Sequence, residues 1–315
     1  MLPKRSLQPP TTSKYFKPAQ STITNMFIPR KILEERLRTM LTEDIGEGDV
    51  TTSLLVPPET VAEAEVISKE AGTVAGVEEA EILSESLGLT TKTSVKDGDK
   101  VEPGQILLKI EGNARTILVV ERTLLNIISR MSGIATATAS MVERIRKAGA
   151  RTRIACTRKT APGLLYFDKK AVLLGGGDPH RLHLDDMVLI KDNHIAIAGN
   201  VEKAVKKAKE RASFSKKIEV EVTSAEDILP AVYAGADVIM LDNFSPKHVE
   251  KAVALLKDKK LREHVLLEVS GGINERNLLE FASKGVDIIS IGMITNSAKA
   301  LDISLEISNV AKKRN

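Results

Sequence analysis

Apolar positions near the start of the chain recur with the spacing of a helix. The positions that follow Met26 come about every 3.6 residues: Phe27, Ile28, Ile32, Leu33, Leu37 and Leu41. This period predicts an amphipathic helix. Between residues 61 and 112 short apolar runs alternate with glycine and proline, at 64–67, 72–75 and 106–110. With a predicted helix near 78–87, these runs indicate a small α/β layer.

A long helix is predicted over residues 113–148, with a run of small residues from Met131 to Ala137 that suits close helix packing. After residue 150 short apolar runs alternate with helical stretches. Six runs are clear: 153–156, 187–190, 218–222, 238–241, 265–268 and 288–291. A seventh strand is expected at 171–174. Helices are predicted between them at 201–211, 225–233, 246–256 and 274–282.

Repeated strand–helix units of this length favour a parallel sheet closed as a barrel. An open doubly wound sheet is the alternative. It is disfavoured because chemically active residues follow nearly every strand, whereas an open sheet concentrates them at one switch point. The predicted fold class is therefore α/β, with an open seven-stranded α/β barrel and an amino-terminal α/β sandwich domain.

Cationic side chains gather at the predicted carboxyl ends of the strands. They are Arg158, Lys159, His180, Arg181 and Lys191. In such barrels this end carries the reactive groups. Arginine binds carboxylate and phosphate through two parallel hydrogen bonds, while lysine acts as a point charge. Any one of these residues alone is better explained as a solvated charge. Five of them on one face predict a site for a polyanion.

Acidic and glycine residues follow the later strands. Glu221 and Asp242 end neighbouring strands, and carboxylates at such positions suit a Mg²⁺ ion that carries pyrophosphate. The other reading is that they pair only with nearby lysines. Glu219 lies on the same side of its strand as Glu221 and is expected to support it. Ser270, Gly271, Gly272 and Gly292 suit a phosphate, since glycine lets the backbone approach closely.

Composition narrows the class of protein. The chain has 315 residues, a net charge of +4 and only 3% aromatic residues without tryptophan. Binding of single-stranded nucleic acid is therefore not expected, because it depends on aromatic stacking. One cysteine, Cys156, excludes an internal disulfide framework and suits a reducing cytoplasm. No apolar run approaches a membrane span. Residues 1–25 are basic and rich in proline, serine and threonine, and we interpret them as a disordered or mis-assigned extension.

Several stretches together resemble the quinolinate phosphoribosyltransferase family. They are EDIGEGDVTT (43–52), ERTLLNIISRMSGIAT (121–136), TRKTAPGL (157–164), GGGDPHRLHLDDMVLIKDNHI (175–195), IEVEV (218–222), LDN (241–243) and EVSGGI (268–273). The stretches keep the order of the family and cover nearly all of the chain from Met26 onward. TRKT, HR and KDNH together are the most specific. Two departures are Ala161, where threonine is frequent, and Asp178-Pro179 before His180.

The resemblance implies a pentosyltransferase, a nicotinate-nucleotide diphosphorylase (carboxylating). Such an enzyme joins quinolinate to phosphoribosyl pyrophosphate with Mg²⁺, and releases pyrophosphate and CO₂ to give nicotinate mononucleotide for NAD biosynthesis. It implies catalytic roles for Lys159, Lys191, Glu221 and Asp242. The residues it implies for substrate binding are Arg122, Arg158, Lys159, His180, Arg181, Lys191, Glu221, Asp242, Ser270, Gly271, Gly272 and Gly292.

The resemblance also implies assembly and domain limits. Arg122 matches an arginine donated by a neighbouring subunit, so a homodimer or a hexamer of dimers is expected. The predicted domains are 26–130, completed by a carboxyl-terminal helix at 297–315, and a catalytic barrel at 131–296. Three alternatives stay open: a relative acting on nicotinate, a paralogue linked to molybdate transport, and a barrel that binds an anion without catalysis. The five cationic residues named above, together with Arg122, favour quinolinate, which has two carboxylates, over nicotinate, which has one.

Overall fold

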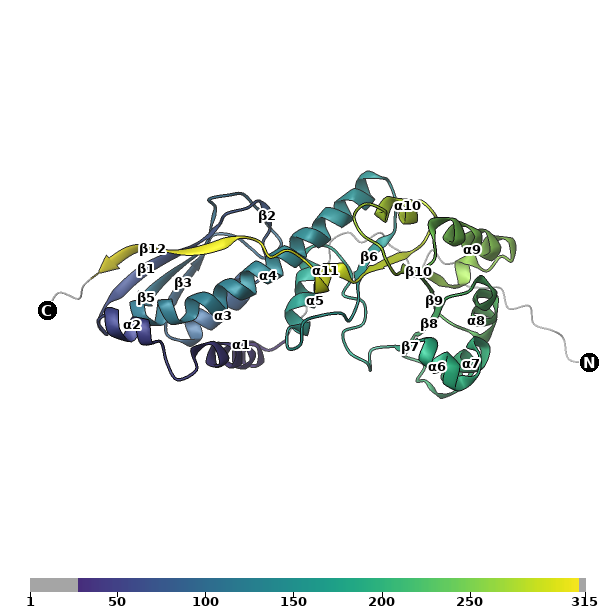
Figure 1. Ribbon diagram of the computed structural model, residues 1–315, viewed down its shortest axis with the longest axis horizontal. Coiled ribbons are helices and arrows are strands. Elements are labelled where there is room, and N and C mark those ends of the chain that lie inside the picture. The colour runs from purple at the N-terminus through teal and green to yellow at the C-terminus, as the bar shows by residue number, and fades with distance from the viewer. Residues whose placement is uncertain (1–27, 312–315) are drawn as a thin grey trace, which may run out of the picture. The chain divides into compact units, whose positions relative to one another are not determined.

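The computed structural model describes residues 28–311, which form two compact units (Figure 1). The antiparallel unit contains residues 28–140, 159–179 and 293–311, and the barrel unit contains residues 141–158 and 180–292. Residues 159–179, which lie inside the predicted catalytic domain 131–296, group with the antiparallel unit. The interpretation of residues 1–25 lies outside the described residues.

The antiparallel unit is built on a four-stranded sheet with the order β12-β1-β5-β3 in the described part of the chain. Its strands are β1 (Val61–Ser68), β3 (Thr90–Thr93), β5 (Ile106–Asn113) and β12 (Ile303–Ala311). A separate pair is formed by β2 (Gly72–Thr73) and β4 (Lys100–Val101). The helices are α1 (Arg30–Ile45), α2 (Val50–Leu55), α3 (Val77–Ser86), α5 (Leu165–Leu174), α11 (Met293–Asn296) and most of α4 (Ala114–Lys147).

The spacing of apolar residues in the sequence explains why α1 is a helix and β1 is a strand. Helix α1 buries Leu33, Leu37 and Leu41, which recur every four residues on one face. Strand β1 buries alternate residues, including Ala62, Ala64 and Val66. The helical period matches the prediction from the sequence, and β1 contains the apolar run noted at 64–67.

The carboxyl-terminal segment differs from the prediction. Residues 303–311 form strand β12, antiparallel to β1, and not the expected helix over 297–315. Apolar residues alternate here as Ile303, Leu305 and Ile307, with the two-residue period of a strand. The backbone groups of β1 offer this segment hydrogen-bonding partners that only the folded sheet supplies.

The barrel unit contains a six-stranded parallel sheet within the described residues. Its strands are β6 (Arg153–Cys156), β7 (Val188–Ile190), β8 (Ile218–Val222), β9 (Val238–Asp242), β10 (Leu266–Ser270) and β11 (Ile288–Ile291). Its helices are α6 (Asp192–Ala198), α7 (Val201–Arg211), α8 (Ile228–Ala234), α9 (Pro246–Asp258) and α10 (Leu278–Ala282), with short 3₁₀ turns η2 (Ala225–Asp227) and η3 (Arg262–His264).

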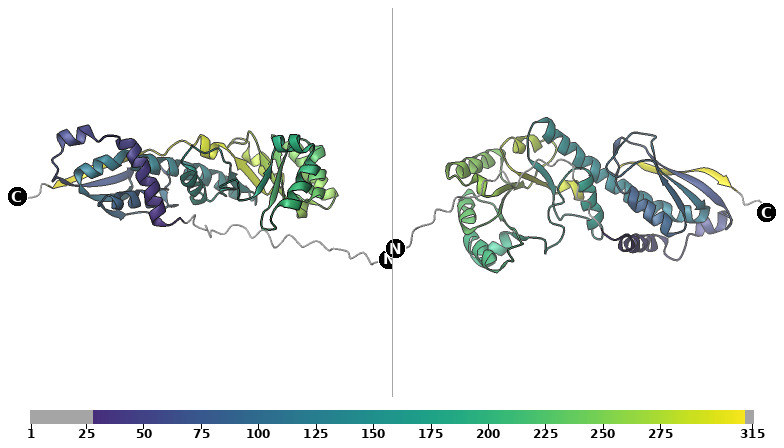
Figure 2. Two further views of the ribbon diagram at one scale, coloured as in Figure 1. Left: turned by 90° about the horizontal axis from the view of Figure 1, so that it is seen from below. Right: turned by 180° about the vertical axis from the view of Figure 1, so that it is seen from behind.

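The strand order identifies an open barrel. Strands β7 to β11 lie side by side in chain order, and β6, the first strand, pairs with β11, the last. A doubly wound sheet would reverse its order at a switch point. Here the sheet returns on itself and is open between β6 and β7. Helices α7, α8 and α9 lie along the outside of the strands (Figure 2).

The seventh strand predicted at 171–174 is wrong. These residues end helix α5, which is almost wholly buried from Tyr166 to Val172. A short apolar run fits a buried helix as well as a buried strand, and the buried aromatic residues ahead of it belong to the same helix. Within residues 28–311, no helix is both long enough and apolar enough to cross a membrane.

Candidate functional site

The two faces of the parallel sheet differ in chemistry. Side chains alternate between faces along each strand, and paired residues of parallel strands share a face. On one face, Met240 of β9 lies between Glu221 of β8 and Glu268 of β10. Two residues nearer the carboxyl ends of the strands, Ser270 of β10 lies between Asp242 of β9 and Ser290 of β11. The opposite face is apolar and buried: Ile154, Cys156, Ile190, Val220, Val222, Ile239, Leu241, Leu267, Val269, Ile289 and Ile291. The helices cover that face, so the polar face lines the barrel interior.

Arg158 and Arg181 bring two positive charges together at this end of the barrel. Arg158 follows β6 by two residues and is exposed, whereas Arg181 is only 8% exposed. Burial and the charge of Arg158 lower the pKa of Arg181. Within residues 28–311 neither guanidinium forms an ion pair with a carboxylate, and Arg181 donates a long 3.5 Å hydrogen bond to the Met187 carbonyl. Two guanidiniums whose charges act on each other, and which have no carboxylate partner among these residues, favour the binding of an anion.

His180 lies against two buried acids. Its Nε2 is 3.1 Å from Oε2 of Glu219 and 3.4 Å from Oε2 of Glu268, and both glutamates are fully buried. Burial alone would lower the pKa of His180, but its interactions with the two carboxylates outweigh burial and raise that pKa to about 10. Burial also raises the pKa of Glu219. The ring is therefore an imidazolium at neutral pH.

Lys191 and Glu221 form an ion pair, with Nζ 2.7 Å from Oε2. The side chain of Glu221 is 14% exposed and that of Lys191 is 46% exposed. Asp242 lies on the same face of the next strand and accepts a 2.7 Å hydrogen bond from Nδ2 of Asn243. The carboxylates of Glu221 and Asp242 are of the kind that Mg²⁺ prefers and both reach the open end of the barrel. A metal ion there would share Glu221 with the Lys191 ammonium.

The Ser270-Gly271-Gly272 turn follows β10 closely. Gly271 and Gly272 have positive φ angles of 95° and 64°. A Cβ atom on Gly271 would overlap Oδ1 of Asn243 and lie 2.9 Å from its backbone nitrogen, which donates to the Ser270 carbonyl. Only glycine fits this close approach. The helix predicted from residue 274 begins at Leu278, so its amino terminus does not contribute to this turn. Gly292 directly follows β11.

Two predicted site residues belong to the antiparallel unit. Lys159 follows Arg158 in the chain, its side chain is exposed, and its carbonyl accepts a 2.9 Å hydrogen bond from Oγ1 of Thr295. Arg122 is exposed on α4 and has no ion-pair partner in the part of the chain that the structure describes. The other ten predicted residues all lie in the barrel unit. Eight of them lie at or just beyond the carboxyl ends of strands, whereas His180 and Arg181 lie in the connection between α5 and β7, because the strand expected before them is a helix.

Glu268 and Ser290 on the same interior face were not predicted. Glu268 precedes Ser270 by two residues, and Ser290 precedes Gly292 by two. The alternation of a strand places each on the same side as the residue that was singled out. This signal was available in the sequence, and it requires the strands to be assigned first.

Two clusters bring potential metal ligands within 4.8 Å of one another: His180, Glu219 and Glu268, and Glu78, Glu79 and Asp97. Each already holds a cation of the protein. His180 supplies an imidazolium to the first, and Lys170 binds all three acids of the second. Both clusters are therefore better explained as internal ion-pair networks.

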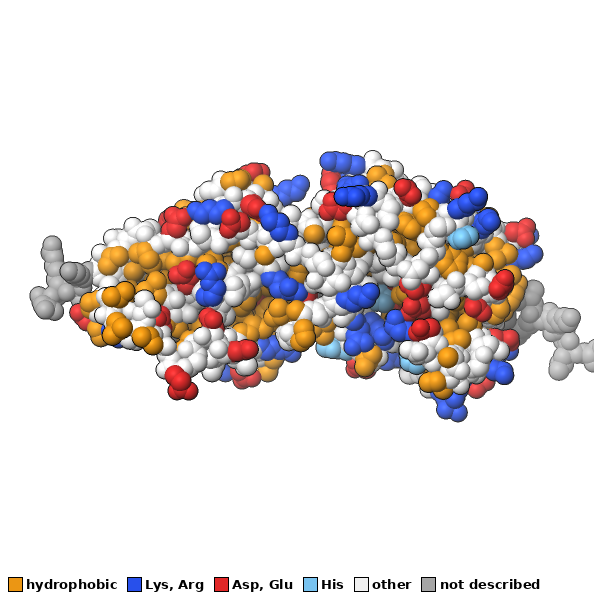
Figure 3. Space-filling model, viewed as in Figure 1, with side chains coloured by type: hydrophobic (Ala, Val, Ile, Leu, Met, Phe, Trp, Pro, Cys, Tyr) orange, Lys and Arg blue, Asp and Glu red, His pale blue; other side chains and the backbone are white. Residues whose placement is uncertain are grey.

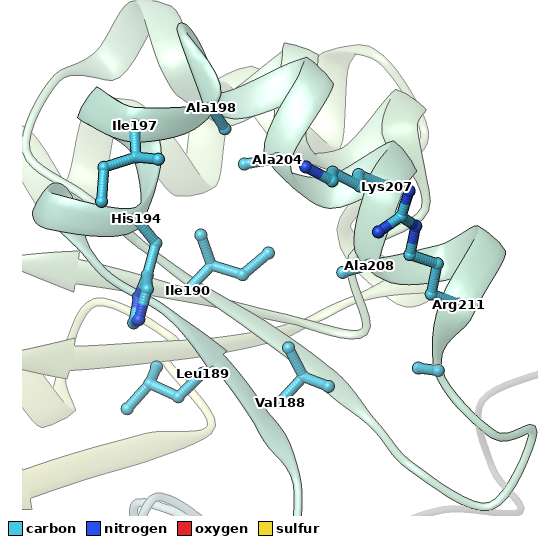
Figure 4. Close-up of a pocket in the computed structure, with 11 residues that line it drawn as sticks. Val188, Leu189, Ile190, His194, Ile197, Ala198, Ala204, Lys207, Ala208 and Arg211 are labelled. Atoms are coloured by element: carbon cyan, nitrogen blue, oxygen red, sulfur yellow. The ribbon is translucent and has the colours of Figure 1, made fainter.

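A cavity of about 500 Å³ lies away from these residues, between β7 and helices α6 and α7 (Figure 4). Its walls are mainly aliphatic, with Lys207 and Arg211 on one side and His194 on the other. None of the predicted site residues lines it.

The fold and site define a protein with an open α/β barrel whose mouth gathers cationic side chains, joined to an antiparallel α/β unit. Models of the amino- and carboxyl-terminal domains of quinolinate phosphoribosyl transferase match residues 49–132 and 134–306. The chain belongs to the quinolinate phosphoribosyl transferase family.

Individual relatives agree. A protein of Methanothermobacter thermautotrophicus named probable nicotinate-nucleotide pyrophosphorylase [carboxylating] is 48% identical over 271 residues, which cover 86% of this chain and 97% of that protein. The human nicotinate-nucleotide pyrophosphorylase [carboxylating] is 39% identical over 246 residues, or 78% and 82% of the two chains. The structure of the Francisella tularensis nicotinate-nucleotide pyrophosphorylase superposes with a TM-score of 0.82 at 38% identity, covering 90% and 98% of the two chains.

Proposed function

We propose that this protein transfers the phosphoribosyl group of phosphoribosyl pyrophosphate to the nitrogen of quinolinate. Pyrophosphate leaves, the 2-carboxylate departs as CO₂ while ring carbon 2 takes up a proton in its place, and nicotinate mononucleotide is formed for NAD biosynthesis. The observation that carries the proposal is the pair of guanidiniums, Arg158 and Arg181, which lack a carboxylate partner among the described residues. Two such groups suit the two carboxylates of quinolinate.

The proposed chemistry depends on position and charge. The anomeric carbon becomes cation-like as pyrophosphate leaves, so groups that orient both substrates and stabilise charge account for the rate. Lys159 and Lys191 supply positive charge for the departing phosphates. Glu221 and Asp242 lie where carboxylates can stabilise the ribosyl centre. Ser270 to Gly272, with Gly292, supply a turn that a phosphate can approach.

Mg²⁺ is proposed to bind together with phosphoribosyl pyrophosphate. It neutralises charge on the phosphates when bound. Glu221 and Asp242 would hold it, directly or through water, since they are the acids that share the open end of the interior face with Lys191. The Lys191 ammonium keeps Glu221 in place when the ion is absent.

The activity is tested with purified full-length protein, Mg²⁺ and carboxyl-labelled quinolinate. Labelled CO₂ is expected only when phosphoribosyl pyrophosphate is present. Arg158→Ala is expected to abolish turnover, while Arg151→Ala leaves it unchanged, because Arg151 is an exposed arginine at the opposite end of β6. Turnover of nicotinate with none of quinolinate contradicts the substrate assignment and supports the nicotinate relative.

A homodimer, alone or within a hexamer, is proposed to complete the site. Arg122 is exposed and without an ion-pair partner within residues 28–311. Val50, Leu54 and Leu55 are each more than two-thirds exposed on α2 (Figure 3), and such apolar patches favour contact with another protein surface. If Arg122 serves the neighbouring subunit, inactive Arg122→Ala and Lys159→Ala proteins regain activity when their subunits exchange. Exchange without recovery places Arg122 in the site of its own chain.

A cytoplasmic location is proposed because the chain has a single cysteine, Cys156, and so cannot form an internal disulfide. Fractionation of cells that express the protein tests it. Recovery in the membrane or extracellular fraction contradicts it.

A further inference from the structure

Two fully buried glutamates face the inside of the barrel, where burial of charge is costly. Glu219 lies on β8 and Glu268 on β10, with Met240 of β9 between the two strands. Three of their four carboxylate oxygens have no hydrogen-bond partner in the described residues. Moving an ionised carboxylate out of water costs several kcal/mol unless a partner compensates. The packing of an apolar core therefore does not explain why these two acids are buried here.

The compensating partner is His180, which lies within 3.4 Å of both carboxylates. His180 belongs to the connection between α5 and β7 and has a φ angle of 51°, a left-handed conformation that non-glycine residues seldom adopt. Such backbone strain persists only where surrounding contacts hold the residue. The hydrogen bond between His180 and Glu219, and the 3.4 Å charge contact of His180 with Glu268, are contacts of this kind.

Arg181, the next residue in the chain, explains why His180 has to be held in place. Arg181 is buried and close enough to Arg158 to feel its charge, so the two guanidiniums repel each other before an anion binds. The negative charge of Glu219 also acts on Arg181, in the favourable direction. If Glu219 and Glu268 did not hold His180, Arg181 would turn toward solvent. Part of the free energy of anion binding would then be used to return Arg181 to the site.

We propose that Glu219 and Glu268 are positioning residues that hold His180, and through it Arg181, so that the Arg158–Arg181 pair is already formed for a dicarboxylate. This rests on the proposed function, which assigns that pair to quinolinate. Neither glutamate touches the substrate. They act by reducing the free energy needed to assemble the pocket, which improves affinity without changing the chemical step.

The test uses Glu219→Gln and Glu268→Gln in the full-length enzyme, since each removes one charge and keeps the side-chain volume. Either variant suffices if the other fails to fold. Glu79→Gln is the matched control, because Glu79 is a fully buried glutamate of the antiparallel unit. We expect the KM for quinolinate to rise about tenfold or more, the scale of one lost hydrogen bond to a charged group. The KM for phosphoribosyl pyrophosphate and the kcat change less than about threefold.

Calorimetric titration of the variants with quinolinate alone gives a second readout, in which its Kd rises by the same factor. A double-mutant cycle of Glu268→Gln with His180→Asn tests whether the acid acts through His180. Strongly non-additive changes in Kd are expected.

An unchanged quinolinate KM overturns the inference, as does an equal rise in both KM values, which is what a general structural defect produces. Additive effects in the cycle overturn the route through His180. Absence of quinolinate turnover in the unaltered protein is a different result. It refutes the proposed function, whatever the glutamate variants do.

Discussion

Gly133 of α4 tests how closely the small residues of this helix must pack. In an exposed helix the change from glycine to alanine stabilises by about 1 kcal/mol, because glycine loses more backbone freedom on folding. Here a Cβ atom would overlap the carbonyl oxygen of Lys299 and lie 2.9 Å from Cα of Ala300. Both contacts are with backbone, so no side-chain rotation relieves them.

The segment that Gly133 contacts is also tied to α4. The backbone N–H of Leu301 donates a 2.9 Å hydrogen bond to the Ser129 carbonyl. Overpacking of this kind costs about 1–3 kcal/mol, and a weakened hydrogen bond adds roughly 0.5–1.5 kcal/mol. These costs exceed the gain in helix propensity, so Gly133→Ala should lower the free energy of unfolding by about 1–3 kcal/mol.

The measurement is urea unfolding followed by far-ultraviolet circular dichroism, with Ser140→Ala as the control. Ser140 is exposed on the same helix, so alanine there gains propensity without a clash. We expect a lower midpoint for Gly133→Ala and an equal or slightly higher one for Ser140→Ala. A Gly133→Ala protein as stable as the unaltered one refutes the packing argument.

Three further predictions follow from buried charges and the tight turn. Asp168 is fully buried and binds Arg130 through hydrogen bonds of 2.7 and 2.8 Å, so Asp168→Asn should reduce stability by about 2–3 kcal/mol in thermal unfolding; an unchanged melting temperature contradicts this. Burial raises the pKa of Glu79 to about 7, despite the nearby Lys170. The folded chain then keeps a proton that the unfolded chain loses from about pH 4.5 upward. Stability should therefore fall as pH rises from 4.5 to 7, by up to about 3 kcal/mol, and Glu79→Gln should remove this slope; an identical pH profile refutes the assignment. Gly271→Ala should raise the KM for phosphoribosyl pyrophosphate at least about tenfold, because a side chain there displaces the turn; normal kinetics would show that the turn does not contact that substrate.

Much of the fold follows from the sequence because its elements are strongly periodic. The six strands of the barrel and the helix from Ala114 to Lys147 lie within a few residues of their predicted positions. Apolar alternation and helical spacing are local signals, so they can be recognised without knowledge of the neighbours. The run at 171–174 was misassigned because a short apolar run is consistent with either state. The helix expected at 297–315 came from the family resemblance, and the strand-like alternation of Ile303, Leu305 and Ile307 was not used. The buried surroundings of α5 and the pairing of β12 with β1 decided each case.

The candidate site shows the same division. The sequence by itself determined which residue types follow the strands, and hence that cations, acids and glycines meet at the carboxyl ends of a parallel sheet. Only the tertiary structure decided their partners. It places His180 on Glu219 and Glu268, pairs Lys191 with Glu221, and brings Arg158 close enough to Arg181 for its charge to lower the Arg181 pKa. These partners come from strands and loops far apart in the chain, so their distances, burial and charges exist only once the barrel has closed from β6 onto β11.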